Sequence, residues 1–184
     1  MKRSYLFLAT GFEETEALAT VDVLRRAGMP VTVVSILKDR LVTGAHGITV
    51  AADEVLPAVP FDEADWLILP GGMPGATHLR SCQPLTDALK AHNAKGGRIA
   101  AICASPAVVL ADLGILDGRK ATAYPGFEDA LTKGGATPTG TRVAVDGNVI
   151  TGNGPASTFA FALAVVEATL GKAKADEVAQ GMLV

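Results

Sequence analysis

Short apolar runs alternate with longer segments of helical periodicity along most of the chain. The apolar runs predict strands at Tyr5–Ala9, Val31–Ile36, Trp66–Leu69, Arg98–Ile102 and Lys120–Ala123. The helical patterns lie at Glu14–Ala27, Gln83–Ala94, Ala104–Ala111 and about Pro155–Leu170. Strand–helix alternation of this kind predicts an α/β fold, in which helices cover both faces of a mainly parallel sheet.

Two further segments and the last helix refine this pattern. Leu41–Ala51 predicts a small extended excursion with glycine turns, and Asp146-Gly147-Asn148 predicts a hairpin between Arg142–Val145 and Val149–Thr151. The segment Pro155–Leu170 is apolar nearly all round, so we expect that helix to be deeply buried.

The chain has 184 residues, of which 49% are hydrophobic, and its formal net charge is −3. This composition predicts one compact domain over residues 1–184 and excludes a disordered or fibrous protein. The longest basic cluster is Arg25-Arg26, which argues against nucleic acid or an anionic membrane as a partner. The apolar runs are too short for a transmembrane helix. Two cysteines, Cys82 and Cys103, are too few for a disulfide framework, so we expect a reducing cytoplasmic location.

Unusual residues follow four of the predicted strands. They lie at Gly11–Glu16, Gly71–Gly75, Cys103–Pro106 and Gly152–Ser157. In open parallel sheets, ligands bind beyond the carboxyl ends of the strands. We therefore expect these four segments to converge on one crevice.

Cys103 stands between a predicted strand and the helical segment that follows it. A sharp strand-to-helix turn is the geometry by which other α/β enzymes expose a nucleophile. The N-terminus of the helix is expected to lower the pKa of the thiol, and nearby backbone N–H groups can hold an oxyanion. Free cysteine is also among the most buried residue types. The pattern alone leaves both interpretations open, a reactive thiol or a core residue.

Three glutamates open the first predicted helix. Glu13 and Glu14 are expected to face water and to complement the helix dipole. Glu16 lies further along the helix and can point elsewhere. Beside a cysteine, a buried Glu16 would be protonated and would hydrogen-bond the sulfur.

The histidines and the glycine-rich stretch indicate no specific metal-binding or nucleotide-binding function. No two of His46, His78 and His92 have the spacing of metal ligands, so no metal site is predicted. His92 ends a polar helix and is expected to be solvated. The stretch "LPGGMPGA" lacks both the phosphate-loop and the dinucleotide-binding patterns. It predicts either a tight turn with positive φ or backbone donors that face the cysteine.

Taken together, several strings resemble the ThiJ/PfpI superfamily and, within it, the DJ-1 branch. They are "GFEETEAL", "LILPGGMPGA", "AAICASPAVVL" and "DGNVITGNGPAS", in this order, and the resemblance covers nearly the whole chain. It implies a flavodoxin-like fold and a homodimer. By motif, Cys103 is the reactive cysteine, Glu16 is the glutamate that hydrogen-bonds it, and Gly72 and Ala104 provide backbone donors to the sulfur.

The chain departs from the DJ-1 branch at three positions. Tyr124 stands where a histidine lies near the site, His46 replaces an interface arginine, and Asn153 replaces an arginine before the Gly-Pro motif. Gly71 and Pro155 are further candidates for lining the site. His46 is either an ordinary turn residue or a titratable group that approaches the reactive cysteine of the partner subunit.

The resemblance implies several activities that use the same cysteine. The first hypothesis is a glyoxalase or deglycase acting on small 2-oxoaldehydes, with methylglyoxal converted to lactate without glutathione, metal or cofactor. The alternative is a redox sensor or chaperone whose cysteine oxidises to a sulfinic acid. The peptidase branch carries a histidine directly after the cysteine. That position is Ala104 here, which argues against an amidase or peptidase.

Overall fold

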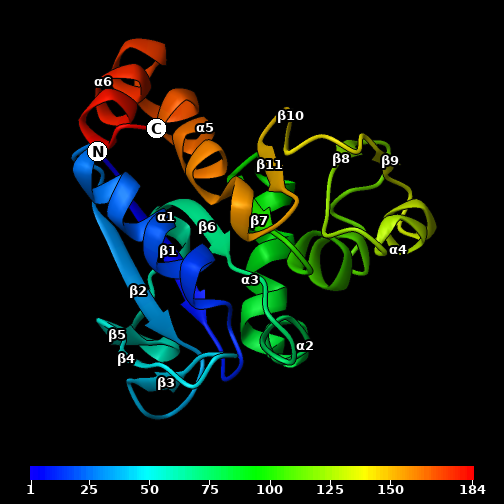
Figure 1. Ribbon diagram of the computed structural model, residues 1–184. Helices are drawn as coiled ribbons and strands as arrows, with labels where there is room; N and C mark the ends of the chain where they lie inside the picture. Colours follow the sequence, from blue (N-terminus) through cyan, green and yellow to red (C-terminus); the bar gives the residue numbers. More distant parts are fainter.

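The computed structural model describes all 184 residues, Met1–Val184. They form three layers, with one large sheet between two layers of helices (Figure 1). The sheet has seven strands in the order β10-β11-β7-β6-β1-β2-β5. All neighbouring strands run parallel except β10, which forms an antiparallel hairpin with β11. The strands are β1 (Arg3–Leu8), β2 (Val31–Ser35), β5 (Glu54–Val55), β6 (Ala64–Leu69), β7 (Arg98–Ile102), β10 (Val143–Asp146) and β11 (Val149–Gly152).

Helices cover both faces of this sheet. One face packs against α1 (Glu14–Arg26), α5 (Thr158–Leu170) and α6 (Lys172–Met182). The other packs against α2 (Gly75–Ser81), α3 (Gln83–Ala94), α4 (Glu128–Lys133) and the short helix η3 (Pro106–Ala111). Three single 3₁₀ turns complete the helical elements, η1 (Leu56–Ala58), η2 (Phe61–Glu63) and η4 (Pro155–Ser157).

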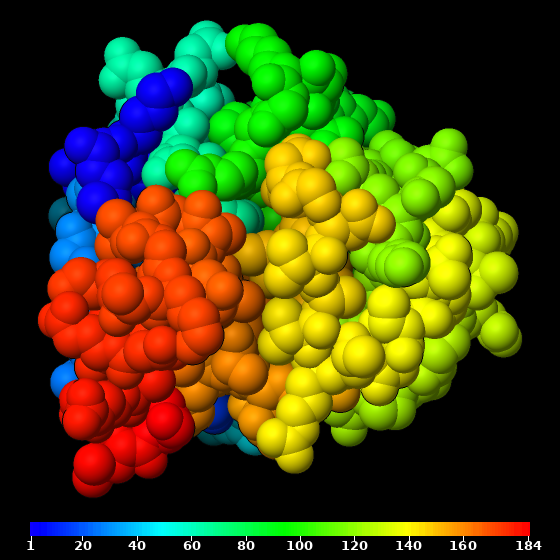
Figure 2. Space-filling view, turned by 90° about the horizontal axis from the view of Figure 1, so that it is seen from above, coloured from blue at the N-terminus to red at the C-terminus, as the bar shows by residue number.

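Two small ladders lie outside the large sheet. The strands β3 (Leu41–Thr43) and β4 (Thr49–Ala51) form an antiparallel hairpin, which is the predicted extended excursion. The strands β8 (Lys120–Ala121) and β9 (Thr137–Pro138) pair in parallel. The N-terminal residues lie beside the C-terminal helices, as the blue and red segments show in Figure 2.

Alternation along the central strands builds the two cores. In β1, Leu6 and Leu8 belong to the core under α1 and α5, whereas Tyr5 and Phe7 belong to the core under α2 and α3. Both faces of the strand are buried, so its sequence is a nearly continuous run of apolar residues, as expected for a parallel sheet covered on both sides. The predicted flavodoxin-like fold is confirmed.

The structure corrects several predicted helices and strands. Helix α5 is buried on one side only, and Phe159 near its start is 37% exposed. The helix predicted from Ala104 begins at Pro106 and has the wider π-helical turn. The strand predicted at Lys120–Ala123 ends at Ala121. No helix combines the length and the hydropathy needed to cross a lipid bilayer.

Candidate active site

The loops after β1, β6, β7 and β11 meet at the carboxyl edge of the sheet, as predicted. The N–H group of Glu13 donates to the carbonyl oxygen of Gly71 at 2.9 Å, joining the loops after β1 and β6. The N–H group of Cys103 donates to the carbonyl oxygen of Gly152 at 2.9 Å, joining those after β7 and β11. The four segments therefore form one site.

Cys103 occupies a strained turn between β7 and η3. Its φ is +66°, a left-handed value that is uncommon for residues other than glycine. Hydrogen bonds hold both of its peptide groups, because its carbonyl oxygen accepts the N–H of Tyr124 at 2.9 Å. The residue is only 9% exposed. The strain is thus maintained by the surrounding structure and directs the sulfur into the site, as at other nucleophile turns.

Glu16 is fully buried in the first turn of α1 and faces the thiol. Its Oε2 accepts the N–H of Gly71 at 2.8 Å, and the carboxyl group lies close enough to Cys103 to hydrogen-bond its thiol. Its Oε1 is buried without a fixed partner. One carboxyl oxygen is therefore anchored, and the other is left for proton exchange.

Glu13 places Glu16, a role that the sequence analysis missed. Its Oε2 accepts the N–H of Glu16 at 2.6 Å and caps α1. Glu13 and Glu14 are 9% and 5% exposed, so the expectation that both face water is wrong. The signal in the sequence was an acidic residue three positions before Glu16, a spacing typical of a helix cap.

Glycine is required where the loop after β6 crosses the cysteine. A Cβ atom at Gly71 would lie 2.5 Å from the Cβ of Cys103 and 2.7 Å from Oε2 of Glu16. Gly72 has a φ of +89°, which glycine adopts without strain. The N–H groups of Gly72 and Ala104 face the sulfur and act to lower the pKa of the thiol.

Burial nevertheless dominates the electrostatics of the pair. Burial, and after it the charge of Glu16, raises the pKa of the Cys103 thiol to about 12. Burial also raises the pKa of Glu16 to about 7. The expected lowering of the thiol pKa by a helix N-terminus is therefore wrong, because desolvation outweighs the two N–H donors. Near neutral pH the thiol keeps its proton, while the Glu16 carboxyl can gain or lose one.

The other predicted lining residues surround the mouth of the site. The ring of Tyr124 is half exposed, and its Cδ2 would lie 3.2 Å from a Cβ atom at Gly154. Asn153 is partly buried, and its side chain accepts a hydrogen bond from Ser157. Pro155 is exposed and opens η4. The segment Gly152–Pro155 thus joins Cys103 on one side and Tyr124 on the other.

His46 lies in the β3–β4 hairpin and bonds to a glutamate of its own chain. Its Nδ1 is 2.8 Å from Oε2 of Glu14, and its N–H donates to Oε1 of Glu14 at 2.7 Å. Burial opposes ionisation of Glu14, but the hydrogen bonds from His46 and Ile48 lower its pKa below the ordinary value. Bonding to Glu14 raises the pKa of His46. Ligand atoms of Glu13, Glu14 and His46 lie within 4.8 Å of one another, a set that could hold a metal ion.

The other two histidines do not approach the cysteine. Nδ1 of His78 bonds the carbonyl oxygen of Thr10 at 2.9 Å. His92 is partly buried against Gly97, and its Nε2 has no hydrogen-bond partner. The prediction that His92 is solvated is wrong, because the packing of its ring against Gly97 takes Nε2 out of water.

The DJ-1/PfpI family model matches residues 2–168. The chain belongs to the DJ-1/PfpI family. It is 40% identical over 176 residues to protein DJ-1 homolog A of Arabidopsis thaliana, covering 96% of this chain and 45% of that protein. The chain thus spans less than half the length of this plant member of the family. It is 36% identical over 164 residues to the glutathione-independent glyoxalase DJR-1.2 of Caenorhabditis elegans, covering 89% and 86% of the two chains.

A solved structure of the DJ-1/PfpI family has nearly the same fold. Toxoplasma gondii DJ-1, in an oxidised form, superposes with a TM-score of 0.95 at 40% identity, covering 100% of this chain and 98% of that one. The resemblance inferred from the motifs is confirmed at the level of family and fold.

Proposed function

We propose that this DJ-1/PfpI family member is a cysteine-dependent enzyme that isomerises small 2-oxoaldehydes to 2-hydroxy acids without glutathione. Methylglyoxal, giving lactate, is the simplest substrate. The observation that carries the proposal is the pairing of Cys103 with a buried Glu16 whose pKa is about 7. A general acid–base group works best when its pKa lies near the operating pH. The glyoxalase name of the worm relative supports the same reaction class.

The reaction starts with transfer of the thiol proton. Glu16, in its ionised form, takes the proton from Cys103 as the sulfur attacks the aldehyde carbon. The product is a hemithioacetal, with the proton delivered to the former aldehyde oxygen. The N–H groups of Gly72 and Ala104 stabilise negative charge at the sulfur and on the attacked oxygen. The thiolate is therefore needed only during attack, and a resting thiol with a high pKa is compatible with turnover.

Isomerisation then moves one proton between two carbons and one between their oxygens. Glu16 removes the hydrogen from the former aldehyde carbon as a proton, which gives an enediolate. A proton then passes from the oxygen on that carbon to the oxygen on the neighbouring carbon, and Glu16 returns its own proton to the neighbouring carbon. This leaves a thioester of the 2-hydroxy acid on Cys103. Water hydrolyses the thioester, releases the acid and restores the thiol. The sequence is an internal redox reaction, so it consumes no external oxidant or reductant and needs no cofactor.

The test is lactate formation from methylglyoxal in the absence of glutathione. The wild-type protein is expected to form lactate, and Cys103→Ser is expected to reduce the rate to background. Cys82→Ser is the matched control, because Cys82 is the second free cysteine and stands at the N-cap position of α3, outside the candidate active site. Equal rates for the wild type and Cys103→Ser would overturn the proposal.

A redox sensor using the same cysteine is the second candidate. The oxidised form of the Toxoplasma relative favours it. The raised pKa of Cys103 disfavours it, because oxidation proceeds through the thiolate. Intact mass after mild peroxide treatment separates the two. A gain of two oxygens that requires Cys103, together with no lactate formation, would favour sensing.

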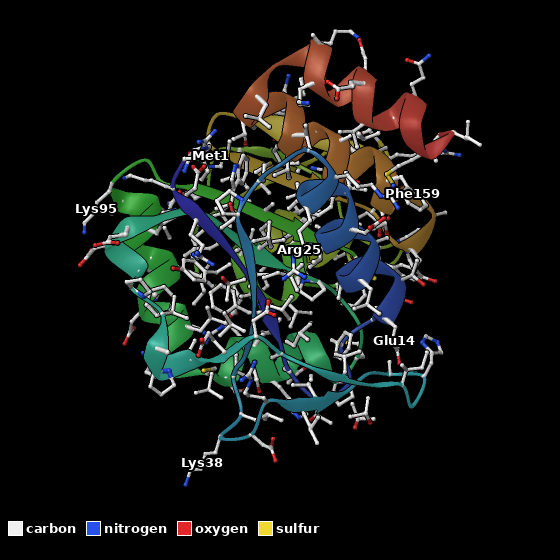
Figure 3. The ribbon with its side chains drawn as sticks, turned by 90° about the vertical axis from the view of Figure 1, so that its left-hand side faces the viewer. Met1, Glu14, Arg25, Lys38, Lys95 and Phe159 are labelled. Carbon is white, nitrogen blue, oxygen red and sulfur yellow. The ribbon has the colours of Figure 1, made fainter.

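We also propose that the protein is a homodimer whose interface is built on α1 and α5. Leu18, Ile48 and Phe159 are exposed apolar side chains. Leu18 follows Glu14 by one turn of α1, and Ile48 donates its N–H to Glu14. Phe159 lies on the same side of the molecule as Glu14 (Figure 3). Exposed apolar groups gathered on one face are typical of an interaction surface.

A further inference from the structure

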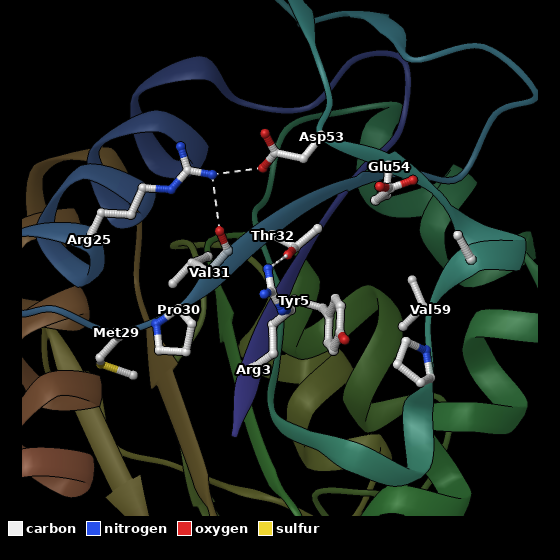
Figure 4. A pocket seen from close by; sticks show the side chains of 12 residues that line it. Arg3, Tyr5, Arg25, Met29, Pro30, Val31, Thr32, Asp53, Glu54 and Val59 are labelled. Atoms are coloured by element: carbon white, nitrogen blue, oxygen red, sulfur yellow. Dashed lines mark hydrogen bonds and ion pairs between the residues drawn. The ribbon is translucent and has the colours of Figure 1, made fainter. Parts of the chain in front are cut away.

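A second pocket lies at the other end of the sheet, beside the first residues of β1 and β2 (Figure 4). Its volume is about 740 Å³, within the range of small-molecule sites. It opens where the helices leave the sheet edge uncovered, between the end of α1, β5 and the turn after η1. Cys103 follows the carboxyl end of β7, so this pocket is separate from the candidate active site.

The backbone N–H and carbonyl groups on the edge of β2 in this pocket already have hydrogen-bond partners. The carbonyl oxygen of Val31 accepts Nη2 of Arg25 at 3.0 Å. The N–H of Val33 donates to Oδ2 of Asp53 at 2.8 Å, and the carbonyl oxygen of Val33 accepts the N–H of Asp53 at 2.9 Å. An added peptide strand binds through free backbone groups of an edge. Because these groups are occupied, recognition here must come from side chains, which favours a small molecule over a peptide.

One cation in the pocket lacks an anionic partner. Arg25 forms an ion pair with Asp53 at 2.7 Å. Arg3 donates from Nη1 to Oγ1 of Thr32 at 2.9 Å and forms no ion pair. A guanidinium has five N–H donors arranged to bind a carboxylate or phosphate in pairs. Arg3 therefore retains donors for an oxyanion, and its exposed side chain lies near the middle of the pocket in Figure 4.

The other residues that line the pocket determine which chemical groups the ligand needs besides its acid group. Met29, Pro30, Val59 and Pro60 form apolar sides, and buried Tyr5 lies beside Arg3. Burial raises the pKa of Tyr5, so its hydroxyl stays protonated and can donate a hydrogen bond. Glu54 lies on the far side of the pocket from Arg3 (Figure 4) and repels an acid group there. The pocket thus has the Arg3 guanidinium on one side, the Glu54 carboxylate on the other and apolar walls between them.

We propose that this pocket binds a small organic oxyanion, with its phosphate or carboxylate on Arg3 and its apolar body between Pro30 and Val59. The site does not rest on the proposed glyoxalase activity and uses none of its residues. Its occupant is a compound with one acid group and an aromatic or branched aliphatic body.

The experiment titrates the ¹⁵N-labelled protein with phenyl phosphate and with benzoate, following the amide resonances of Thr32 and Val33. Both ligands are expected to shift these resonances and to leave those of Gly72 and Ala104 unchanged. The two acids together report whether phosphate or carboxylate is preferred. Inorganic phosphate carries only the charge and benzyl alcohol only the body, so each is expected to bind at least tenfold more weakly, since both contacts contribute.

Substitution then tests the arginine. Arg3→Gln keeps a hydrogen-bond donor and removes the charge, and is expected to weaken binding of phenyl phosphate about tenfold. Arg80→Gln is the matched control, because Arg80 pairs with Asp112 on another part of the surface. The proposal is overturned by any of three results: no shifts at Thr32 and Val33 up to about 10 mM ligand, equal binding by Arg3→Gln, or equal binding of benzyl alcohol. Cys103→Ser is expected to bind normally, which separates this site from the active site.

Discussion

The thiol of Cys103 and the carboxyl of Glu16 share a buried space in which two negative charges cannot coexist at low cost. Burial raises the pKa of both groups, and the charge of Glu16 raises the pKa of the thiol further. The hydrogen bond from the Cys103 thiol acts in the opposite direction on Glu16 and lowers its pKa. The carboxyl has the lower pKa, so it ionises first and acts as the base for the thiol. At the residue scale, the reactivity of the site is therefore set by the protonation of Glu16.

Glu16→Gln should separate turnover from thiol reactivity. Glutamine keeps the shape of the side chain but cannot exchange a proton, so lactate formation should fall roughly 10²- to 10⁴-fold. The charge of Glu16 raises the pKa of the thiol. Without that charge the thiol pKa falls, and alkylation of Cys103 by iodoacetamide at pH 8 to 9 should be faster than in the wild type. Initial rates of the two reactions, measured on the same preparation, check this.

The pH profile provides the control for that variant. Wild-type turnover at low substrate should rise through a step near pH 7, because the ionised form of Glu16 is the base and its pKa is about 7. The residual turnover of Glu16→Gln should lack this step. A normal rate in the variant would show that Glu16 is not the proton carrier.

Gly71→Ala tests the close approach of the loop after β6. The added Cβ atom would lie 3.0 Å from the sulfur of Cys103 and closer still to Cys103 Cβ and Glu16. Overpacking of this kind should lower the free energy of unfolding by about 1–3 kcal/mol and should displace the reacting groups, so lactate formation should also fall. Gly181→Ala is the matched control. Nothing lies within 4 Å of its added Cβ, and it should be neutral or stabilising by up to about 1 kcal/mol. Urea denaturation of both variants measures the difference.

Glu14 joins the β3–β4 hairpin to α1, and this link can be tested at the scale of elements. Its carboxylate accepts the N–H groups of His46 and Ile48 and bonds the His46 ring. In Glu14→Gln the charge is lost, and the amide hydrogens of His46 and Ile48 should exchange with solvent about tenfold faster. Asp22→Asn, on the exposed side of α1, should leave both exchange rates unchanged.

The same link should weaken in acid. The pKa of folded Glu14 lies below its ordinary value of 4.5. The contribution of this carboxylate to stability is therefore present above pH 4.5 and is lost as the pH falls through the lower, folded pKa. Protection of the His46 amide should decline over that range in the wild type and should be flat in Glu14→Gln.

The elements that the sequence predicted are those with strong apolar periodicity. Helix α1 and the central strands bury most of their apolar residues, so the spacing of apolar residues in the sequence predicts where these elements lie. Helix α6 buries only Ala175 and Val178 within a polar segment, and α2 begins in the glycine-rich turn. Neither produces a clear period, so both were missed. Helix α5 was placed correctly, but its exposed apolar side cannot be distinguished from a buried one by composition.

The candidate active site was also predictable only in part. The order of strands and turns predicted that Cys103, Gly71 and Glu16 would meet, because they follow or face the carboxyl ends of adjacent strands. The pKa of the thiol could not be predicted, since it depends on how completely the site excludes water. The bond between Glu14 and His46 spans 32 positions in sequence, and no local pattern indicates such a contact.

The stability of the whole molecule should depend on pH through His92. Burial lowers the pKa of this side chain in the folded protein below 6.5, and its Nε2 has no partner. The unfolded chain takes up a proton as the pH falls below 6.5, whereas the folded chain resists it, so the free energy of unfolding should fall between pH 6.5 and the folded pKa. His92→Gln should reduce this dependence, whereas His78→Gln, at an exposed position, should not. Urea midpoints from pH 5 to 8 measure it, and identical slopes for the wild type and His92→Gln would contradict the assignment.

The proposed dimer makes the last prediction. A symmetric interface brings the same surface of each subunit together, so one substitution changes it twice. Phe159 is 37% exposed on α5, and Phe159→Glu would place two carboxylates in an apolar contact. The variant should fold, because Phe159 belongs to neither hydrophobic core, but the dissociation constant should rise roughly 10²-fold or more. Val145→Glu, on the exposed side of β10, should leave the dimer intact. Sedimentation velocity over a concentration series measures both. A wild-type protein that sediments as a monomer at all concentrations would contradict the proposed dimer. A dimer that persists in Phe159→Glu would show that the interface does not include Phe159.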